Sequence, residues 1–309
     1  MNKSFLLSVI IPCFNEEGNI EKLYSSLKEE LISYPDHEII FINDGSNDNT
    51  LNIIKELANT DSKLKYISLS RNFGHQNALK AAIDKASGDC IISMDADLQH
   101  PPQLIGQLIE KWKQGYEIVY TKRLSEKELP LIKKITSKYF YKLLNLISET
   151  RIEQGTADFR LIDRKVAGVI KDLPENDLFI RGLISWVGFN QIGIEFKPEK
   201  RFSGDTKYSF YKMIKFAMSG ISSFSVKPLK LSIIMGFFIA FLSFIYALYA
   251  VYVSIFTNYT IQGWTSVIVS VLFMGGIQLI MIGILGEYLG KLFIENKRRP
   301  NYIISETNI

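Results

Sequence analysis

Cysteine and histidine are scarce in this sequence of 309 residues, which contains two cysteines and three histidines. Cys13 and Cys90 support neither a disulfide framework nor a zinc site, and we interpret both as packing residues of a reduced, cytoplasmic chain. The sequence has no G-x-S-x-G segment, and three histidines leave little room for a Ser-His-Asp triad. These absences leave hydrolase chemistry without support.

Two glycine motifs of nucleotide-binding proteins are also missing. None of the twenty glycines forms a G-x-G pair, and no G-x-x-x-x-G-K-[ST] segment occurs. Rossmann dehydrogenases and P-loop NTPases are therefore excluded. The formal net charge of +4 is too small to indicate a nucleic-acid partner, and none is expected.

Charged residues are absent between residues 231 and 286, a stretch that a soluble domain of ordinary composition does not contain. A polar centre divides it into apolar segments at about 231–256 and 264–286, and each exceeds the roughly 20 residues that span a bilayer. We predict a transmembrane hairpin of two helices. The competing interpretation is a buried hairpin of a soluble protein, for which helices of only about 12 residues would suffice.

Basic residues gather on both sides of this hairpin. Residues 197–230 contain eight lysines or arginines and two acids, and four more basic residues follow the second span. The positive-inside rule then places everything before residue 231 and both termini in the cytoplasm, with the chain crossing the plasma (inner) membrane twice. Apolar residues at helical spacing predict an interfacial amphipathic helix over 208–227; a stripe packed between helices is the alternative interpretation.

The first 120 residues alternate between short β-rich runs and helical patterns. We expect strands at 8–11, 38–42, 64–68, 89–94 and 117–120, and helices at 20–32, 49–58, 77–86 and 102–114. Strands separated by helices are typical of βαβ units, which form a mostly parallel sheet with ligands at the carboxyl ends of its strands. The predicted fold class is therefore α/β.

A polar cluster, NDGSND at 43–48, follows the second of these strands. A carboxylate in this position, such as Asp44, can accept hydrogen bonds from a nucleoside, and Gly45 allows the backbone to approach closely. For Asp48, capping of the next helix is a sufficient explanation by itself. The cluster suits a sugar nucleotide as the ligand.

Two acids, Asp95 and Asp97, follow the fourth predicted strand. Because they are two residues apart, their side chains point to the same side of an extended chain and repel each other. A hard divalent cation that bridges to diphosphate oxygens would relieve this repulsion, and oxygen ligands favour Mg or Mn over zinc. Gln99 is a candidate neutral ligand for the same ion.

Seven segments in order carry the most specific signal, namely 8–17 (SVIIPCFNEE), 43–48, 70–76 (SRNFGHQ), 95–99 (DADLQ), 158–164 (DFRLIDR), 201–208 (RFSGDTKY) and 286–300. Together they resemble the inverting family 2 glycosyltransferases of GT-A fold. The resemblance covers nearly the whole chain and is to the polyisoprenyl-phosphate branch, which includes dolichyl-phosphate mannose synthase and bacterial undecaprenyl-phosphate glucosyltransferases. Thr206 stands where this family often has serine, and the hydroxyl survives that change.

The resemblance implies a role for each matching residue. Donor-nucleotide binding is implied for Pro12, Phe14, Glu16, Asp44, Arg71, Gly74 and Asp95, and metal binding for Asp95, Asp97 and Gln99. Catalytic roles are implied for Asp97, Asp158 and Arg160; an ordinary surface ion pair is the alternative interpretation for the last two. Arg201 and Lys207 are natural ligands of an acceptor phosphate, with Arg123, Lys134 and Ser137 as weaker candidates. A solvated or headgroup-facing surface is the alternative interpretation for these basic residues.

The activity implied by this resemblance is transfer of a hexose, with glucose from UDP-glucose as the first choice, to undecaprenyl phosphate with inversion. The product would be a lipid-linked donor for cell-envelope glycans. N-acetylhexosamine, galactose, mannose, aminoarabinose and a GDP donor stay open. A processive polysaccharide synthase is less favoured because Q-x-x-R-W is absent, and a non-catalytic membrane scaffold is less favoured because the acidic pair is present.

The predicted organisation has four parts. A cytoplasmic catalytic domain spans 1–207, an interfacial helix 208–227, the two transmembrane helices 228–290 and a cytoplasmic C-terminal tail 291–309. Glycines in and after the second span permit close helix approach, and family analogy suggests a homo-oligomer, with a tetramer as the expectation.

Overall fold

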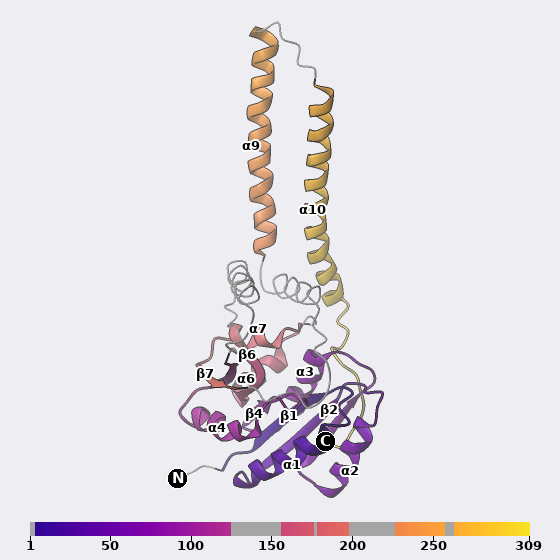
Figure 1. Ribbon diagram of the computed structural model, residues 1–309, viewed down its shortest axis with the longest axis vertical. Coiled ribbons are helices and arrows are strands. Elements are labelled where there is room, and N and C mark those ends of the chain that lie inside the picture. The colour runs from indigo at the N-terminus through magenta and orange to yellow at the C-terminus, as the bar shows by residue number, and fades with distance from the viewer. Residues whose placement is uncertain (1–3, 125–155, 176–177, 198–225, 257–262) are drawn as a thin grey trace.

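The computed structural model describes residues 4–124, 156–175, 178–197, 226–256 and 263–309 (Figure 1). In Figure 1 a sheet with flanking helices forms one body, and two long helices, α9 (Lys227–Phe256) and α10 (Trp264–Asn296), project from it side by side. Nearly all of the predicted interfacial helix at 208–227 lies outside the described residues. The same holds for four predicted acceptor ligands, Lys134, Ser137, Arg201 and Lys207.

The described strands form one mixed sheet of eight strands in the order β7-β5-β6-β4-β1-β2-β3-β8. Their bounds are Leu7–Cys13 (β1), His37–Asn43 (β2), Leu64–Leu69 (β3), Cys90–Ser93 (β4), Ile118–Arg123 (β5), Thr156–Asp163 (β6), Gln191–Phe196 (β7) and Ile304–Thr307 (β8). The pairs β1–β2, β1–β4, β2–β3 and β5–β7 are parallel, whereas β6 is antiparallel to β4 and β5, and β8 to β3. The predicted α/β fold of GT-A type, with a mostly parallel sheet, is confirmed.

Helices cover both faces of this sheet. Their bounds are Ile20–Glu30 (α1), Thr50–Thr60 (α2), His75–Lys85 (α3), Ile105–Lys113 (α4), Arg164–Asp172 (α6) and Ile180–Trp186 (α7), with short 3-10 turns at Leu31–Ser33 and Pro102–Leu104. All seven residues of β1 are buried: Val9 and Ile11 pack with α1 and α4, whereas Ile10 packs with α3 and α6 on the other face. A strand covered on both faces needs this uninterrupted apolar run.

Every segment expected in the first 120 residues is present with the predicted type, and only its ends differ by a few residues. Both cysteines are free and buried in strands of the sheet. Burial raises the pKa of the Cys13 and Cys90 thiols, so both stay protonated and act as packing groups, as the sequence indicated.

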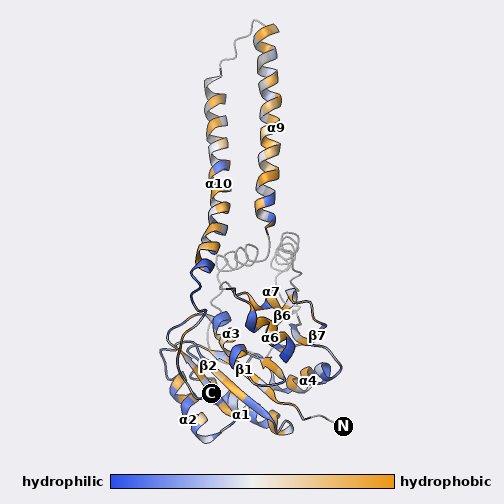
Figure 2. Ribbon diagram, turned by 180° about the vertical axis from the view of Figure 1, so that it is seen from behind, coloured by the Kyte–Doolittle hydropathy of each residue, from blue (hydrophilic) through white to orange (hydrophobic). Residues whose placement is uncertain are grey.

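The two long helices carry the apolar residues of the chain's C-terminal third, as the colours of Figure 2 show. Among the described residues, Phe273–Asn296 of α10 is long and apolar enough to cross a membrane, and 0% of its most apolar window is buried inside the protein. Ser232–Tyr246 of α9 is a shorter apolar helix. The rest of the described chain does not cover these side chains, as it would cover those of a core helix. That α9 and α10 cross a membrane stays a prediction.

Gly45 occupies a position that only glycine fits. Its φ is +66°, and a Cβ atom there would lie 2.4 Å from the backbone carbon of Arg71. We expect Gly45→Ala to lower the free energy of unfolding by about 1–3 kcal/mol through backbone strain and overpacking. Gly18→Ala is the matched control, since no heavy atom lies within 4 Å of that Cβ. Thermal unfolding in detergent measures both, and equal midpoints for the two variants would contradict the packing argument.

Glu38 is a buried carboxylate whose bonds predict acid sensitivity. It accepts hydrogen bonds from Ser8 Oγ (2.5 Å), Ser87 N (2.6 Å) and Lys65 Nζ (2.6 Å). Burial by itself would raise its pKa, but these three donors outweigh burial and lower it. The folded-state pKa is therefore below the unfolded value of about 4.3, so this stabilisation is present above pH ~4.3 and is lost as the pH falls through the lowered pKa.

The variant Glu38→Gln tests the direction of this pH dependence of stability. We expect it to be less stable than the parent at pH 7 by about 1–3 kcal/mol, because it leaves a buried donor without its acceptor. It should also lose less stability than the parent between pH 5 and pH 3. Glu29→Gln, at an exposed position of α1, is the control. Parallel stability curves against pH for Glu38→Gln and the parent would refute the assignment.

Candidate active site

At the carboxyl edge of the sheet, hydrogen bonds from backbone N–H groups to side-chain oxygens connect the loops that follow β1 and β2. Asn15 N donates to Ser46 Oγ (3.0 Å), Asn47 N donates to Asn15 Oδ1 (2.8 Å), and Glu16 N donates to Thr50 Oγ1 (2.9 Å). Parallel strands place these loops next to each other, and their short polar side chains supply the bonds. The two loops therefore form one continuous wall.

Asp44 fastens a third loop, the one after β3, to this wall. Its Oδ1 accepts from Phe73 N (2.7 Å), and its Oδ2 accepts from Gly74 N (2.9 Å). Burial raises the pKa of Asp44, and the two backbone donors only partly offset this. The same loop passes within contact distance of Gly45, where the missing side chain leaves room for it. Asp44 thus has a structural task in addition to its predicted contact with the donor.

Asp95 is held at the end of β4 by a buried histidine. Asp95 N donates to His100 Nδ1 (3.1 Å), and the His100 ring stacks on Phe159 with 5.2 Å between centroids. Burial lowers the pKa of His100, so the ring is neutral and its Nδ1 is free to accept. Farther along the loop, Asp97 Oδ1 accepts from Gln99 N (3.2 Å). These bonds close the turn that carries the acidic pair.

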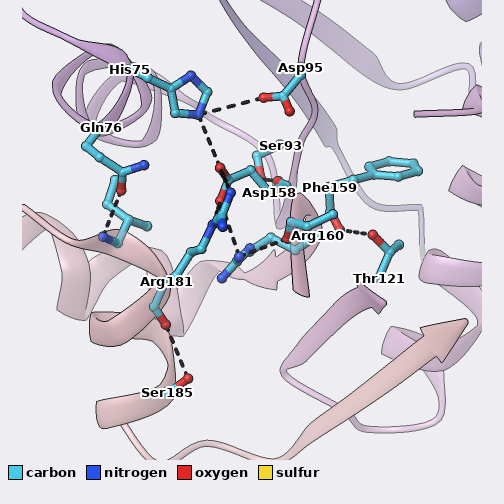
Figure 3. Close-up of polar contacts among 12 residues, drawn as sticks. His75, Gln76, Ser93, Asp95, Thr121, Asp158, Phe159, Arg160, Arg181 and Ser185 are labelled. Atoms are coloured by element: carbon cyan, nitrogen blue, oxygen red, sulfur yellow. Dashed lines mark hydrogen bonds and ion pairs between the residues drawn. The ribbon is translucent and has the colours of Figure 1, made fainter. Parts of the chain in front are cut away.

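Asp158, on β6, is the centre of the most densely charged part of the site (Figure 3). Arg181 of α7 donates two hydrogen bonds to its carboxylate, Nε to Oδ1 and Nη2 to Oδ2, each of 2.6 Å. Arg160 Nη2 lies 3.4 Å from Oδ1. Burial by itself would raise the pKa of Asp158, but the charge and hydrogen bonds of Arg181 hold it well below its ordinary range. Asp158 is therefore a carboxylate at every physiological pH.

Arg160 lies beneath this carboxylate and is almost fully buried. Its Nη2 donates to Ala157 O (2.9 Å), and its Nε has no hydrogen-bond partner among the described residues. Burial lowers the pKa of Arg160 to about 10, which leaves the guanidinium charged near neutral pH. The interpretation of Asp158 and Arg160 as an ordinary surface ion pair is wrong, because both side chains are buried and Arg181 is the closer partner.

His75, the first residue of α3, joins the two acidic positions. Its Nε2 lies 3.4 Å from Asp158 Oδ2 and 3.7 Å from Asp95 Oδ1 (Figure 3). Partial desolvation would lower its pKa, but the hydrogen bond to Asp158 and the two negative charges outweigh it and raise the pKa. One ligand atom from each of His75, Asp95 and Asp158 lies within 4.8 Å of the others, a spacing that could hold a metal ion.

The remaining predicted donor residues, and the acceptor candidate Arg123, lie on the same edge of the sheet. Pro12 is buried near the end of β1, where the pairing with β4 has already ended at Ser93, so its missing N–H leaves no gap. Phe14 is exposed just beyond it, and Glu16 accepts from Asn19 Nδ2 (2.6 Å). Arg71 lies over the Phe73 ring at 4.1 Å from the ring centroid. Gly74 precedes α3, and Arg123 is exposed at the end of β5.

Two residues of this cluster were not predicted from the sequence. His75 lies in the SRNFGHQ motif but was given no role, and Arg181 lies in a segment without a matching motif. A signal for Arg181 does exist, since it is the one charged residue in the apolar run LFIRGLISW at 178–186. A lone charge in a buried helix needs a partner of opposite charge, and Asp158 is that partner.

Known families account for both parts of the molecule. Residues 8–170, more than half of the chain, match the family described as Glycosyl transferase family 2. The chain belongs to this family. Residues 227–292, which include α9 and most of α10, match the family described as GtrB C-terminal hairpin. The predicted family is confirmed, and the protein is a glycosyltransferase.

Several relatives match this glycosyltransferase from end to end. The uncharacterized glycosyltransferase YkcC of Bacillus subtilis (strain 168) is 44% identical over 308 residues, which cover 99% of this chain and 95% of the relative. The prophage bactoprenol glucosyl transferase homolog of Escherichia coli (strain K12) is 44% identical, with 96% of this chain and 98% of the relative covered. The bactoprenol glucosyl transferase of Shigella phage SfV is 43% identical, with 96% and 97% covered.

Proposed function

We propose that this glycosyltransferase transfers glucose from UDP-glucose to a polyprenyl phosphate, with undecaprenyl phosphate as the acceptor, and inverts the anomeric centre. The observation that carries the proposal is the Asp158 cluster, in which a buried carboxylate organises His75, Arg160 and Arg181 beside the acidic loop of Asp95. The names of relatives such as the enzyme of phage SfV support glucose and bactoprenol as the two reactants.

The donor would lie along the wall formed by the loops after β1, β2 and β3. We assign nucleoside binding to Pro12, Phe14, Glu16 and Asp44, with Arg71 and Gly74 beside the sugar and diphosphate. Exposure of Phe14 at the rim, together with buried Asp44 below it, supports this assignment, since a flat ring and a carboxylate suit a base and its polar edge.

The potential ligand atoms of the acidic loop favour a divalent cation. Asp95, Asp97 and Gln99 offer oxygen ligands, which favour Mg or Mn, and Asp95 also faces the nitrogen atoms of His75 and His100, each at 3.7 Å. We propose that Asp95 and Asp97 hold this ion with Gln99 beside them. When bound, the ion neutralises the charge of the departing nucleoside diphosphate.

In the reaction, an oxygen of the lipid phosphate would form a bond to the anomeric carbon while the bond from that carbon to the diphosphate breaks. Little deprotonation is required, because a phosphate monoester is largely ionised near neutral pH. Asp158 is held as a carboxylate by Arg181, so we assign it the positioning of cations and acceptor rather than the role of general base. We assign to His75, whose Nε2 lies 3.4 Å from Asp158 Oδ2, the holding of a residual proton.

The acceptor requires the site to lie at a membrane surface. We propose that α9 and α10 both cross the plasma membrane and that the catalytic body and both termini lie in the cytoplasm. Support comes from the hairpin family match and from the basic residues that flank the charge-free segment. Arg201 and Lys207, with Arg123, Lys134 and Ser137, remain the proposed ligands of the acceptor phosphate. Assembly as a tetramer is a further part of this proposal.

The deciding experiment incubates the purified protein in detergent with Mg or Mn, undecaprenyl phosphate and radiolabelled UDP-glucose, and follows the label into the organic phase. UDP-N-acetylglucosamine, UDP-galactose and GDP-mannose serve as competing donors. Lipid labelled only from UDP-glucose supports the proposal, and labelling from another donor corrects the sugar. Binding of UDP-glucose without labelled lipid would refute the acceptor.

A further inference from the structure

The C-terminal segment returns from α10 to the catalytic body and binds it at several points. In Figure 1 it descends from α10 as the yellow trace and runs along the sheet. Asn301 Nδ2 donates to Glu175 O (3.0 Å), and Tyr302 Oη donates to Asp84 Oδ2 (2.9 Å) near the end of α3. The membrane-directed helix is thus connected to the body by a short, firmly bound segment.

Beyond Tyr302 the segment becomes β8 and covers the edge of β3. Ser305 Oγ donates to Ser68 O (2.9 Å), and Thr307 Oγ1 donates to Tyr66 O (2.8 Å). Without β8, one side of β3 would expose a row of unpaired backbone groups, which is unfavourable for a soluble sheet edge. The segment predicted only as a tail therefore completes the sheet.

The last backbone hydrogen bond of this pairing reaches the loop after β3, residues 70–74, which we place beside the nucleotide sugar. Ser70 N donates to Ile303 O (2.9 Å), and Ser70 lies on the same short loop as Phe73 and Gly74, whose backbone N–H groups donate to Asp44. Gly74 immediately precedes α3, whose first residue is His75. The loop at 70–74 is consequently fixed from two sides, by Asp44 inside the site and by the C-terminal segment outside it.

We propose that residues 301–309 are a positioning element of the donor site. They hold the loop at 70–74 in the conformation in which Asp44 and His75 face the site, and they couple that conformation to α10. If the segment is absent, donor binding must also supply the free energy that orders this loop. The donor part of this inference rests on the proposed function; the loop-ordering part does not.

Hydrogen–deuterium exchange on the full-length protein and on a variant truncated after Pro300, in the same detergent, tests the ordering directly. The amides of residues 70–74 should exchange about tenfold faster or more in the truncated chain, while amides of β1 and β2 keep their protection. A synthetic peptide of residues 301–309 should restore the protection. Glu306→Gln, which removes only the exposed ion pair with Lys55, is the control and should leave exchange at 70–74 unchanged.

Two results would overturn the inference: unchanged exchange at 70–74, or an equal loss of protection across the whole sheet, which would mean that β8 acts only on overall stability. If the truncated chain does not fold, the full-length variant Tyr302→Phe/Ser305→Ala carries the same test. It removes two side-chain bonds of the segment, and unchanged exchange at 70–74 in it would likewise refute the inference.

Donor affinity gives the functional readout. Titration with UDP should show about tenfold weaker binding to the truncated chain, and KM for UDP-glucose should rise while kcat changes little. A fall in kcat at constant KM would contradict positioning of the donor. If the full-length protein does not bind UDP, the proposed donor is wrong, whereas the exchange experiment still decides whether the segment orders the loop.

Discussion

Asp158→Asn is expected to abolish most of the transfer activity and to destabilise the fold. The substitution removes the carboxylate that buried Arg160 shares with Arg181, which donates two hydrogen bonds to it. Removal of one partner of a buried ion pair costs about 3–5 kcal/mol of stability. Loss of the electrostatic arrangement around the acceptor should reduce kcat/KM by about 10²–10³-fold. Thermal unfolding and transfer of label to lipid measure the two effects on the same sample.

The double variant Asp158→Asn/Arg181→Gln separates these two effects. Because Arg181→Gln removes the positive charge that Asp158→Asn leaves unpaired, part of the lost stability should return while activity stays low. Coupling between the substitutions is expected because the two side chains are in direct contact. An active double variant would mean that Asp158 serves only to balance Arg181, and an Asp158→Asn variant with normal kcat/KM would remove Asp158 from the catalytic assignment.

Asp97→Asn is expected to reduce transfer by about 10²–10³-fold while membrane insertion stays intact. The asparagine keeps the shape of the side chain and an oxygen that can accept from Gln99 N, but it removes the negative charge that we assign to metal binding. Rates measured across a titration of Mg or Mn reveal the cause, because a weakened ion site should be partly rescued at high metal concentration.

Asp172→Asn is the matched control for this substitution, since Asp172 is an exposed residue at the end of α6, away from the acidic loop. Chelation of divalent ions should suppress the parent enzyme to the level of Asp97→Asn, and added Mg or Mn should restore it. Turnover that is unchanged in Asp97→Asn, or insensitive to chelation, would remove the metal assignment.

The part of the fold that the sequence predicted is the part encoded by local patterns. Apolar runs such as 8–11 and 38–42, followed by helical spacing and polar ends, indicated the strands, the helices and the edge at which ligands bind. The acidic positions Asp44, Asp95 and Asp158 could be named because each stands at a strand in a recognisable motif. Each of these signals is contained in a short stretch of about ten residues, and no tertiary contact is needed to recognise it.

Contacts between distant segments could not be predicted in the same way. Arg181 and Asp158 are 23 residues apart in the chain. Ile303 and Ser70 form a hydrogen bond although the strands β4 to β7 and the whole hairpin separate them in the sequence. The segment 304–307 has no clear strand pattern, and its pairing with β3 depends on an open sheet edge that only the folded chain presents. Register and partner choice are properties of the assembled sheet.

By itself, the sequence determined the class of this protein. Local periodicity indicated an α/β fold with an acidic edge and a charge-free apolar segment, and the resemblance of its motifs implied a glycosyltransferase. The tertiary structure decided how the site is charged. It placed two arginines and a histidine around one buried carboxylate and bound the C-terminal strand next to the loop at 70–74. Charges far apart in the chain alter one another's pKa only after folding brings them within a few ångströms and excludes water between them.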